Sequence, residues 1–273
     1  MKPFAEITVG FIGAGNMAEA IVRGLIQGGN MTPERLLASD VAEERRRIFA
    51  EQFGVRVVED NRSVVAASEV VVVAVKPQML AAALETVHAD WRPGQLLISI
   101  AAGVRAEKLD AACGGVPAII RVMPNTPALV GQGLSAYARG PRANPEHGTL
   151  TEALFATVGD VLCVDETAMD AVTAISGSGP AYVFYWLEAM LAAAGDLGFD
   201  PVTARRLVYQ TLSGSAALAA ASSEAPETLR ARVTSKGGTT EAAIRTLEEG
   251  RVKDNLVAAI HAAAARSREL SNL

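Results

Sequence analysis

A glycine loop between an apolar strand and an amphipathic helix constrains this chain more than any other stretch. Residues 8–12 are an apolar run suited to a buried parallel strand, and residues 17–27 carry apolar side chains at helical spacing. Between them stand Gly13 and Gly15, with Ala18 as the third small residue of a G-x-G-x-x-A pattern. Such a loop lets backbone N–H groups at a helix start approach a pyrophosphate, so the stretch predicts a dinucleotide-binding site.

Composition excludes several other classes of protein. The net charge is −5 and no basic block occurs, which disfavours nucleic acid and anionic membranes as partners. The longest apolar helical stretch, residues 181–194, contains Glu188 and is too short to span a bilayer. Cys113 and Cys163 form no C-x-x-C pair, and no signal peptide precedes the first strand. We therefore expect a soluble, cytoplasmic protein without a structural metal.

An acidic residue closes the second predicted strand, residues 36–39. Asp40 stands at about the distance from the glycine loop at which an acid accepts a hydrogen bond from a ribose 2′-hydroxyl, and it would disfavour a 2′-phosphate. Ser39 could instead donate to a phosphate, and Arg45–Arg47 follow closely, although these arginines can equally be a solvated helix face. The residues alone leave the choice between NADP and NAD open.

Three further predicted strands end in small or polar residues. Strands are predicted at 70–75, 96–100 and 118–122, and then at 133–138 and 161–164 on either side of a helix at 145–158. The first three lead to Lys76-Pro77, to Ala101-Ala102-Gly103 and to Asn125. Ligands of open α/β sheets lie beyond the carboxyl ends of the strands, so these residues are candidates for one site. Alternatively, Lys76 is merely exposed and Pro77 starts a helix.

Strand patterns stop at Asp165, and the remainder indicates helices broken by glycine and proline. Its apolar residues cover more faces than one monomer can bury, which predicts a homo-oligomer. We therefore predict a Rossmann-like, mostly parallel, doubly wound α/β sheet followed by an all-helical dimerisation domain. The dinucleotide-binding domain is assigned to residues 1–164, and the substrate-binding and dimerisation domain to residues 165–273.

A hydroxyl-rich turn, residues 235–240, precedes the last helical region. The N–H groups of Gly237, Gly238, Thr239 and Thr240 can converge on an anion such as a carboxylate. The same residues can instead be only a helix C-cap followed by an N-cap. His88, His147 and His261 are scattered, and neither metal-ligand spacing nor a nucleophile elbow occurs. This favours chemistry carried by a cofactor, such as hydride transfer.

Six ordered motifs resemble pyrroline-5-carboxylate reductase nearly end to end. They are residues 10–18 (GFIGAGNMA), 74–78 (AVKPQ), 99–103 (SIAAG), 121–127 (RVMPNTP), 176–182 (SGSGPAY) and 237–240 (GGTT), the last preceded by Val233-Thr234-Ser235. The resemblance implies NAD(P)H-dependent reduction of 1-pyrroline-5-carboxylate to L-proline, the last step of proline biosynthesis, with NADPH favoured and NADH as the second cofactor. It also implies a homodimer of interlocked C-terminal helices, often assembled further as a decamer.

The resemblance also assigns site residues. For the cofactor these are Phe11, Ile12, Gly13, Ala14, Gly15 and Asn16 at the pyrophosphate, Asn61, Ala74, Val75, Lys76 and Pro77 toward the ribose, and Ala101, Ala102, Gly103 and Asn125 by the nicotinamide, in addition to Ser39 and Asp40. For the substrate they are Ser235, Gly237, Gly238, Thr239 and Thr240, with Thr240 at the family's catalytic threonine. Lys236 stands where proline is common, and Asp40 where some relatives have serine.

Two other functions stay open from the residues. A 3-hydroxyacid dehydrogenase of the same two-domain plan would need a lysine or histidine to manage the alcohol proton, whereas the Gly-Gly-Thr-Thr turn offers only hydroxyls. A nucleotide-sensing protein without turnover would bind NADPH but oxidise it with no cyclic imine. For the reductase, we expect the Thr240 hydroxyl to hydrogen-bond the ring nitrogen, because a threonine does not ionise near neutral pH.

Overall fold

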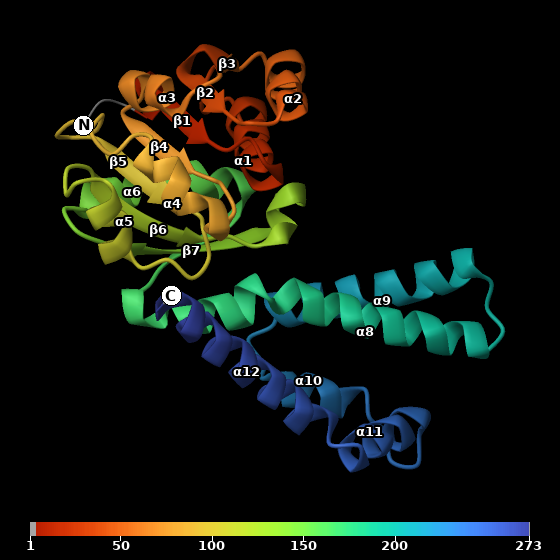
Figure 1. Ribbon diagram of the computed structural model, residues 1–273. Helices are drawn as coiled ribbons and strands as arrows, with labels where there is room; N and C mark the ends of the chain where they lie inside the picture. Colours follow the sequence, from red (N-terminus) through yellow and green to blue (C-terminus); the bar gives the residue numbers. More distant parts are fainter. Residues whose placement is uncertain (1–3, 273) are drawn as a thin grey trace. The chain divides into compact units, whose positions relative to one another are not determined.

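The computed structural model describes residues 4–272, within which eight strands form one sheet (Figure 1). The strands are β1 (Val9–Ile12), β2 (Leu36–Ser39), β3 (Arg56–Val58), β4 (Val70–Val73), β5 (Leu96–Ser99), β6 (Ala118–Met123), β7 (Gly133–Arg139) and β8 (Gly159–Cys163). Their order is β3-β2-β1-β4-β5-β6-β7-β8. Neighbours pair in parallel from β3 to β6, whereas β7 runs antiparallel to β6 and β8 runs parallel to β7. The predicted mostly parallel sheet is confirmed.

Helices cover both faces of the sheet and create two cores. They are α1 (Asn16–Gln27), α2 (Glu43–Phe53), α3 (Asn61–Ala67), α4 (Pro77–Glu85), α5 (Ala106–Ala112), α6 (Pro145–Phe155) and the short α7 (Met169–Val172). Side chains of α1, α2 and α6 share one core with Val70 and Val72, and those of α3, α4 and α5 share the other with Val71 and Val73. Alternate valines of β4 thus face opposite layers, which is why an unbroken apolar run forms this strand.

The sheet reverses its direction of growth at β1. From β1 the chain adds β2 and β3 on one side, and β4 then pairs with the other side of β1. Open α/β sheets bind ligands in the crevice beyond the carboxyl ends of the strands at such a switch point. Gly13 directly follows β1 and Ala74 directly follows β4. The topology therefore places the glycine loop at this crevice.

The contacts separate a second, all-helical unit, Gly179–Ala262, from the sheet unit, which ends at Ser178 and takes in the chain again from Ala263. The helices after Ser178 are α8 (Gly179–Asp196), α9 (Pro201–Ala221), α10 (Pro226–Arg232), α11 (Thr239–Glu249) and α12 (Val252–Asn272). The predicted helical C-terminal domain is confirmed.

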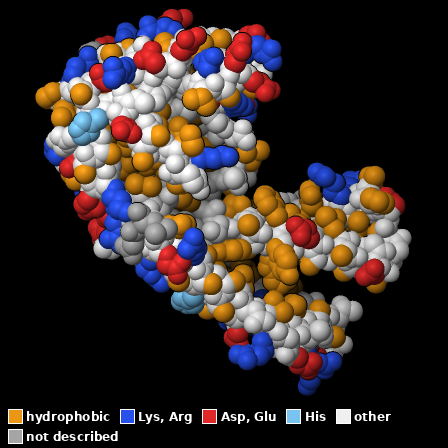
Figure 2. Space-filling model, in the orientation of Figure 1, with side chains coloured by type: hydrophobic (Ala, Val, Ile, Leu, Met, Phe, Trp, Pro, Cys, Tyr) orange, Lys and Arg blue, Asp and Glu red, His pale blue; other side chains and the backbone are white. Residues whose placement is uncertain are grey.

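The helical unit buries little of its own apolar surface. Helices α8 and α9 pack through a small cluster centred on Ala194, Ala204 and Val208. Other large apolar side chains of these two helices stay exposed, among them Val183, Phe184, Tyr185, Val202, Leu207 and Leu218. Figure 2 shows hydrophobic side chains gathered along this part of the molecule. Within residues 4–272, no helix combines the length and apolar character needed to cross a membrane.

Candidate active site

The two glycines of the glycine loop meet different requirements. Gly13 has φ +98°, and a Cβ there would lie 3.0 Å from the backbone carbonyl of Ala74, so the fold itself requires glycine at this position. Gly15 has φ −72° and ψ 179°, which any residue adopts. Apart from Gly15 and its two chain neighbours, no heavy atom of the described residues lies within 4 Å of a Cβ placed on Gly15. The fold therefore does not need glycine at this second position, whereas an approaching ligand would.

The start of α1 is prepared for an anion. Its N-cap is Gly15, and no side chain of the described residues caps it. The N–H groups of the first helical turn therefore keep their hydrogens for a ligand, and the helix dipole adds partial positive charge there. Together with the open space at Gly15, this is the geometry that holds a pyrophosphate.

A cavity of about 460 Å³ opens beside this helix start. Its predicted lining residues are Ile12, Gly13, Gly15, Ser39, Asp40, Asn61, Ala74, Val75 and Lys76. The cavity is also lined by five residues that no sequence motif indicated, Val41, Met79, Ala82, Ala83 and Thr86. Met79 and Ala83 on α4 and its C-cap residue Thr86 recur at helical spacing, so the periodicity of that helix could have identified them. They add an apolar wall suited to a flat base.

Asp40 is held at the end of β2 by two backbone hydrogen bonds. Its Oδ2 accepts from the Ala14 N–H at 2.7 Å, and its Oδ1 accepts from the Ala42 N–H at 2.8 Å. The Ala14 N–H is thus engaged by a side chain and does not face a pyrophosphate. Ser39 is also engaged, because its hydroxyl donates to Asn61 Oδ1 at 2.7 Å. The two backbone hydrogen bonds therefore fix the carboxylate of Asp40 on the β2 side of the cavity.

Two of the neighbouring arginines, Arg45 and Arg46, bind backbone carbonyls beside the cavity. The Arg45 guanidinium donates to the Ala14 carbonyl at 2.6 Å and pairs with Glu19 at 2.7 Å. The Arg46 guanidinium donates to the Asp40 carbonyl at 2.6 Å. The solvated-face interpretation is wrong for this pair. Arg46 places a positive charge next to Asp40, so an acidic and a basic residue lie side by side at the end of β2.

The remaining cofactor candidates divide into three groups. Phe11 is fully buried in the core, so its side chain does not reach the cavity. Pro77 is the first residue of α4, with Lys76 as its N-cap, and Asn16 is the first residue of α1. Residues Ala101–Gly103 and Asn125 follow β5 and β6. Because β5 and β6 run parallel to β1 and β4, these last residues lie at the same edge of the sheet as the glycine loop.

The turn at residues 235–240 lies in the helical unit and opens α11. Gly237 has φ +75° and donates its N–H to Glu241 Oε2 at 2.7 Å, and the Gly238 N–H donates to the Ser235 carbonyl at 3.0 Å. The expectation that four N–H groups converge is therefore wrong for these two. Gly238 is the N-cap, not Thr239, and no side chain in the described part of the chain caps the helix.

The first-turn N–H groups of α11 thus stay available for an anion. They begin with Thr239 and Thr240, and the Thr240 side chain is partly buried. Lys236 lies on the exposed side of the turn. What the turn offers is therefore a helix start with two threonine hydroxyls.

Known proteins of one family match the chain over nearly its whole length. A family model described as pyrroline-5-carboxylate reductase dimerisation matches residues 166–270, and one described as NADP oxidoreductase, coenzyme F420-dependent, matches residues 8–103. A pyrroline-5-carboxylate reductase from Arabidopsis thaliana is 40% identical over 98% of this chain and 97% of its own. The chain belongs to the pyrroline-5-carboxylate reductase family.

Solved structures of this family share the fold. The pyrroline-5-carboxylate reductase of Coxiella burnetii superimposes with a TM-score of 0.89 at 37% identity, covering 97% of this chain and 98% of its own. That of Plasmodium falciparum, solved with NADP bound, superimposes with a TM-score of 0.90 at 28% identity, covering 98% and 99%. The resemblance found in six short motifs thus extends to the whole architecture of the family.

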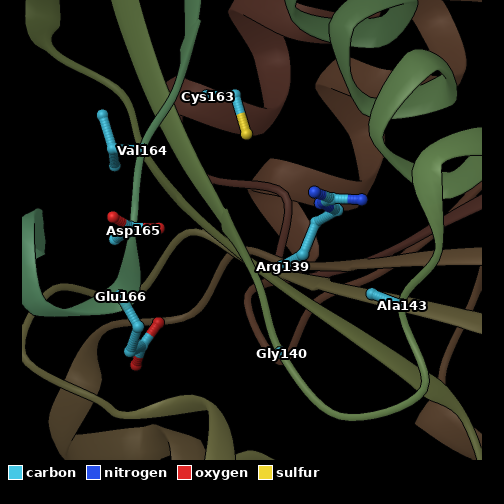
Figure 3. A pocket seen from close by; sticks show the side chains of 7 residues that line it. All are labelled: Arg139, Gly140, Ala143, Cys163, Val164, Asp165 and Glu166. Atoms are coloured by element: carbon cyan, nitrogen blue, oxygen red, sulfur yellow. The ribbon is translucent and has the colours of Figure 1, made fainter.

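A larger cavity, about 580 Å³, lies elsewhere in the sheet unit and is unlike a cofactor site of this family (Figure 3). It is lined by Arg139, Gly140, Ala143, Cys163, Val164, Asp165 and Glu166. Because β7 and β8 run against the other strands, their carboxyl ends lie at the edge of the sheet opposite the glycine loop. Glu166 is already paired with the buried Arg121 at 2.6 Å. None of its lining residues belongs to the glycine loop or to the start of α1.

Two of the three histidines have structural partners. The ring of His88 hydrogen-bonds the Ala112 carbonyl at 2.8 Å, and His147 Nδ1 accepts from the Asn144 N–H at 3.1 Å at the start of α6. Burial lowers the pKa of His147. Among the residues described, no group of three or more His, Cys, Asp or Glu side chains could hold a metal ion.

Proposed function

We propose that this member of the family reduces 1-pyrroline-5-carboxylate to L-proline with hydride from NADPH. Two features of one chain carry the proposal. One is a glycine loop whose second glycine only a bound ligand would require, and the other is a helix start rich in hydroxyl groups. The first suits a pyrophosphate, and the second suits a small carboxylate. The family match over 98% of the chain supports the same reaction.

For the cofactor, we assign the pyrophosphate to the first turn of α1 at Gly15 and Asn16. The adenosine would lie over β2, between Val41 and the α4 wall at Met79. Asp40 would accept from the 2′-hydroxyl of NADH, whereas Arg46 would pair with the 2′-phosphate of NADPH. When bound, the dinucleotide supplies the hydride. We favour NADPH because a relative of 28% identity was solved with NADP bound.

For the substrate, we assign the carboxylate to the N–H groups of Thr239 and Thr240, with Ser235, Gly237 and Gly238 shaping the turn. The ring C=N carbon gains the hydride, and the nitrogen takes a proton from water to become the amine of proline. Thr240 would donate a hydrogen bond to that nitrogen and hold the ring in place. Its hydroxyl orients the imine and does not act as a strong acid, because a threonine hydroxyl keeps its proton near neutral pH.

Replacing Thr240 tests this assignment. Loss of one such hydrogen bond costs about 1–3 kcal/mol, hence roughly tenfold to a hundredfold in kcat/KM for Thr240→Ala. Thr240→Ser keeps the hydroxyl and is expected to retain most of the activity. The matched control is Thr246→Ala on the same helix, whose hydroxyl bonds only the Ala242 carbonyl. Full kcat/KM in Thr240→Ala would remove Thr240 from the mechanism.

We further propose that residues 165–273 bind substrate and form a homodimer, with a decamer as a higher assembly, and that the protein works in the cytoplasm. The exposed apolar side chains of α8 and α9 and the match to a dimerisation model support the dimer. Neither Cys113 nor Cys163 forms a disulfide, which suits a reducing compartment. A monomeric mass in sedimentation, with unfolding independent of protein concentration, would contradict the dimer.

A further inference from the structure

A π-helical turn, Thr173–Gly177, lies beside the end of β6. The Ser178 N–H donates to the Thr173 carbonyl at 2.8 Å, five residues back. Such turns are rare and are frequently found at functional sites. A Cβ on Gly177 would collide with the side chain of Met123, the last residue of β6. The motif at residues 176–180, which has no role in the sequence analysis, thus packs against the end of β6 at the candidate site.

Asn125 fixes the turn in place. Its Oδ1 accepts from the Leu134 N–H at 2.9 Å, and its Nδ2 donates to Ser176 Oγ at 3.1 Å and to the Ser176 carbonyl at 3.3 Å. The Asn125 amide, which was predicted to lie by the nicotinamide, therefore makes three hydrogen bonds to two residues of the protein, Leu134 and Ser176. Asn125 thus connects the end of β6 to β7 and to the π-helical turn by hydrogen bonds. Its bond to Ser176 Oγ fixes the position of that hydroxyl.

That hydroxyl keeps its own hydrogen. In its bond with Asn125 the Ser176 oxygen is the acceptor, and within residues 4–272 no acceptor for its hydrogen is found. The side chain is partly exposed. A serine hydroxyl carries one donor and two acceptor lone pairs, so Ser176 has one donor left for a bound molecule.

The position of Ser176 in the sheet unit decides which part of a dinucleotide it would meet. The cavity reaches Asp40 and Val41 on the β2 side of the glycine loop and Ala74, Val75 and Lys76 on the β4 side. With the adenosine over β2, as proposed above, the nicotinamide would extend in the direction of β4. In that direction β4, β5 and β6 follow β1, so the end of β6 is three strand spacings away, about 14 Å. Ser176 thus lies at the far end of an extended dinucleotide.

The last helix braces this end of the site. Asp170, in the short helix that leads into the π-helical turn, accepts from Ser267 Oγ at 2.6 Å and from Ser271 Oγ at 3.2 Å. Leu270, between them on α12, lies against the Gly103 loop, where a Cβ on Gly103 would be 3.2 Å from the Leu270 Cβ. The π-helical turn and the Gly103 loop are therefore held by the same helix end.

We propose that Ser176 is an additional cofactor-binding residue, whose hydroxyl donates a hydrogen bond to the carboxamide oxygen of the nicotinamide. Asn125 is then a positioning residue that acts through Ser176. This inference rests on the proposed function, because it requires a nicotinamide dinucleotide on the glycine loop. It assigns a role to the serine motif that the reaction at the Gly-Gly-Thr-Thr turn leaves unused.

The test is equilibrium binding, which needs no turnover. NADPH and 2′-phospho-ADP-ribose, which lacks the nicotinamide, are titrated into the wild type and into Ser176→Ala. Loss of one hydrogen bond predicts a Kd for NADPH that is about threefold to tenfold weaker, with binding of 2′-phospho-ADP-ribose unchanged. Ser178→Ala is the control, because its side chain makes no hydrogen bond in the described part of the chain, and it is expected to bind both ligands normally.

Other results would overturn the proposal. Unchanged NADPH binding in Ser176→Ala, or equal weakening of both ligands, would show that Ser176 does not meet the nicotinamide. Asn125→Asp keeps the acceptor for Leu134 and loses the donor to Ser176, so its effect should be non-additive with Ser176→Ala; full additivity would exclude the positioning role. A wild type that binds NADPH but does not reduce 1-pyrroline-5-carboxylate would refute the proposed function alone, because the binding comparison still decides the role of Ser176.

Discussion

Replacing Gly15 with valine should abolish cofactor binding without unfolding the protein. The backbone at Gly15 has φ −72° and ψ 179°, which valine can adopt. Apart from Gly15 and its chain neighbours, no described atom lies within 4 Å of an added Cβ, so valine can be accommodated when no cofactor is bound. Valine is a poorer N-cap than glycine, and it also restricts the unfolded chain. Each effect is worth about 1 kcal/mol or less, and they oppose one another. The expected change in Tm is therefore only a few degrees.

The loss in binding should be far larger. The valine side chain would occupy the space through which a pyrophosphate reaches the first turn of α1. Hydrogen bonds to a charged group contribute about 1.5–3 kcal/mol each, so losing two costs roughly 3–6 kcal/mol, or at least a hundredfold in Kd. Titration of NADPH by its fluorescence, with a thermal melt of the same sample, measures both quantities.

Gly13→Ala is the matched control, because it should show the opposite pattern. At φ +98°, with the Ala74 carbonyl 3.0 Å from the new Cβ, alanine strains the backbone of the folded protein. The Tm of Gly13→Ala without cofactor should therefore fall. Wild-type affinity for NADPH in Gly15→Val would refute the assignment of the pyrophosphate to the first turn of α1. Unfolding of Gly15→Val would refute the argument that only a ligand requires this glycine.

Two further predictions concern cofactor preference and pH. Asp40→Ser removes a carboxylate that would face a 2′-phosphate, so the ratio of kcat/KM for NADPH over NADH should rise about tenfold, for roughly 1–2 kcal/mol of relieved repulsion; an unchanged ratio would exclude Asp40 as the discriminating residue. The pKa of His147 is lowered by burial from its ordinary value of 6.5, so its contribution to stability is complete above about pH 6.5 and is lost as the pH falls. His147→Gln keeps an acceptor for the Asn144 N–H and does not titrate; it should reduce the fall in Tm between pH 7 and pH 5 by a few degrees, and an equally steep fall in this variant would contradict that origin.

Most helices and strands were predictable from the sequence because glycine, proline and apolar spacing act within a few residues of each element. The predicted strand at 36–39 agrees with β2 at both ends, and the predicted strands at 96–100, 118–122 and 133–138 each agree with the structure to within one residue at both ends. Discrepancies arise where tertiary contacts decide. Strand β8 begins at Gly159, earlier than predicted, because Gly159 at φ +147° packs directly on the Gly133 backbone.

The candidate site was predictable in its backbone and less so in its side chains. Glycine spacing and strand ends located the cavity, since both follow from the order of elements. The hydrogen bond from the Ala14 N–H to Asp40, the return of Arg46 onto the Asp40 carbonyl and the Asn125–Ser176 pair join residues far apart or on different elements. No periodicity encodes such contacts, and the π-helical turn likewise depends on what it packs against.

The most direct test of the central claim follows the oxidation of NADPH and NADH by the purified protein with 1-pyrroline-5-carboxylate, with proline identified as the product. We expect rapid proline formation that falls tenfold to a hundredfold in Thr240→Ala and persists in Thr240→Ser. Absence of proline formation with either cofactor, from protein that still binds both, would contradict the account and favour the hydroxyacid dehydrogenase or nucleotide-sensing alternative.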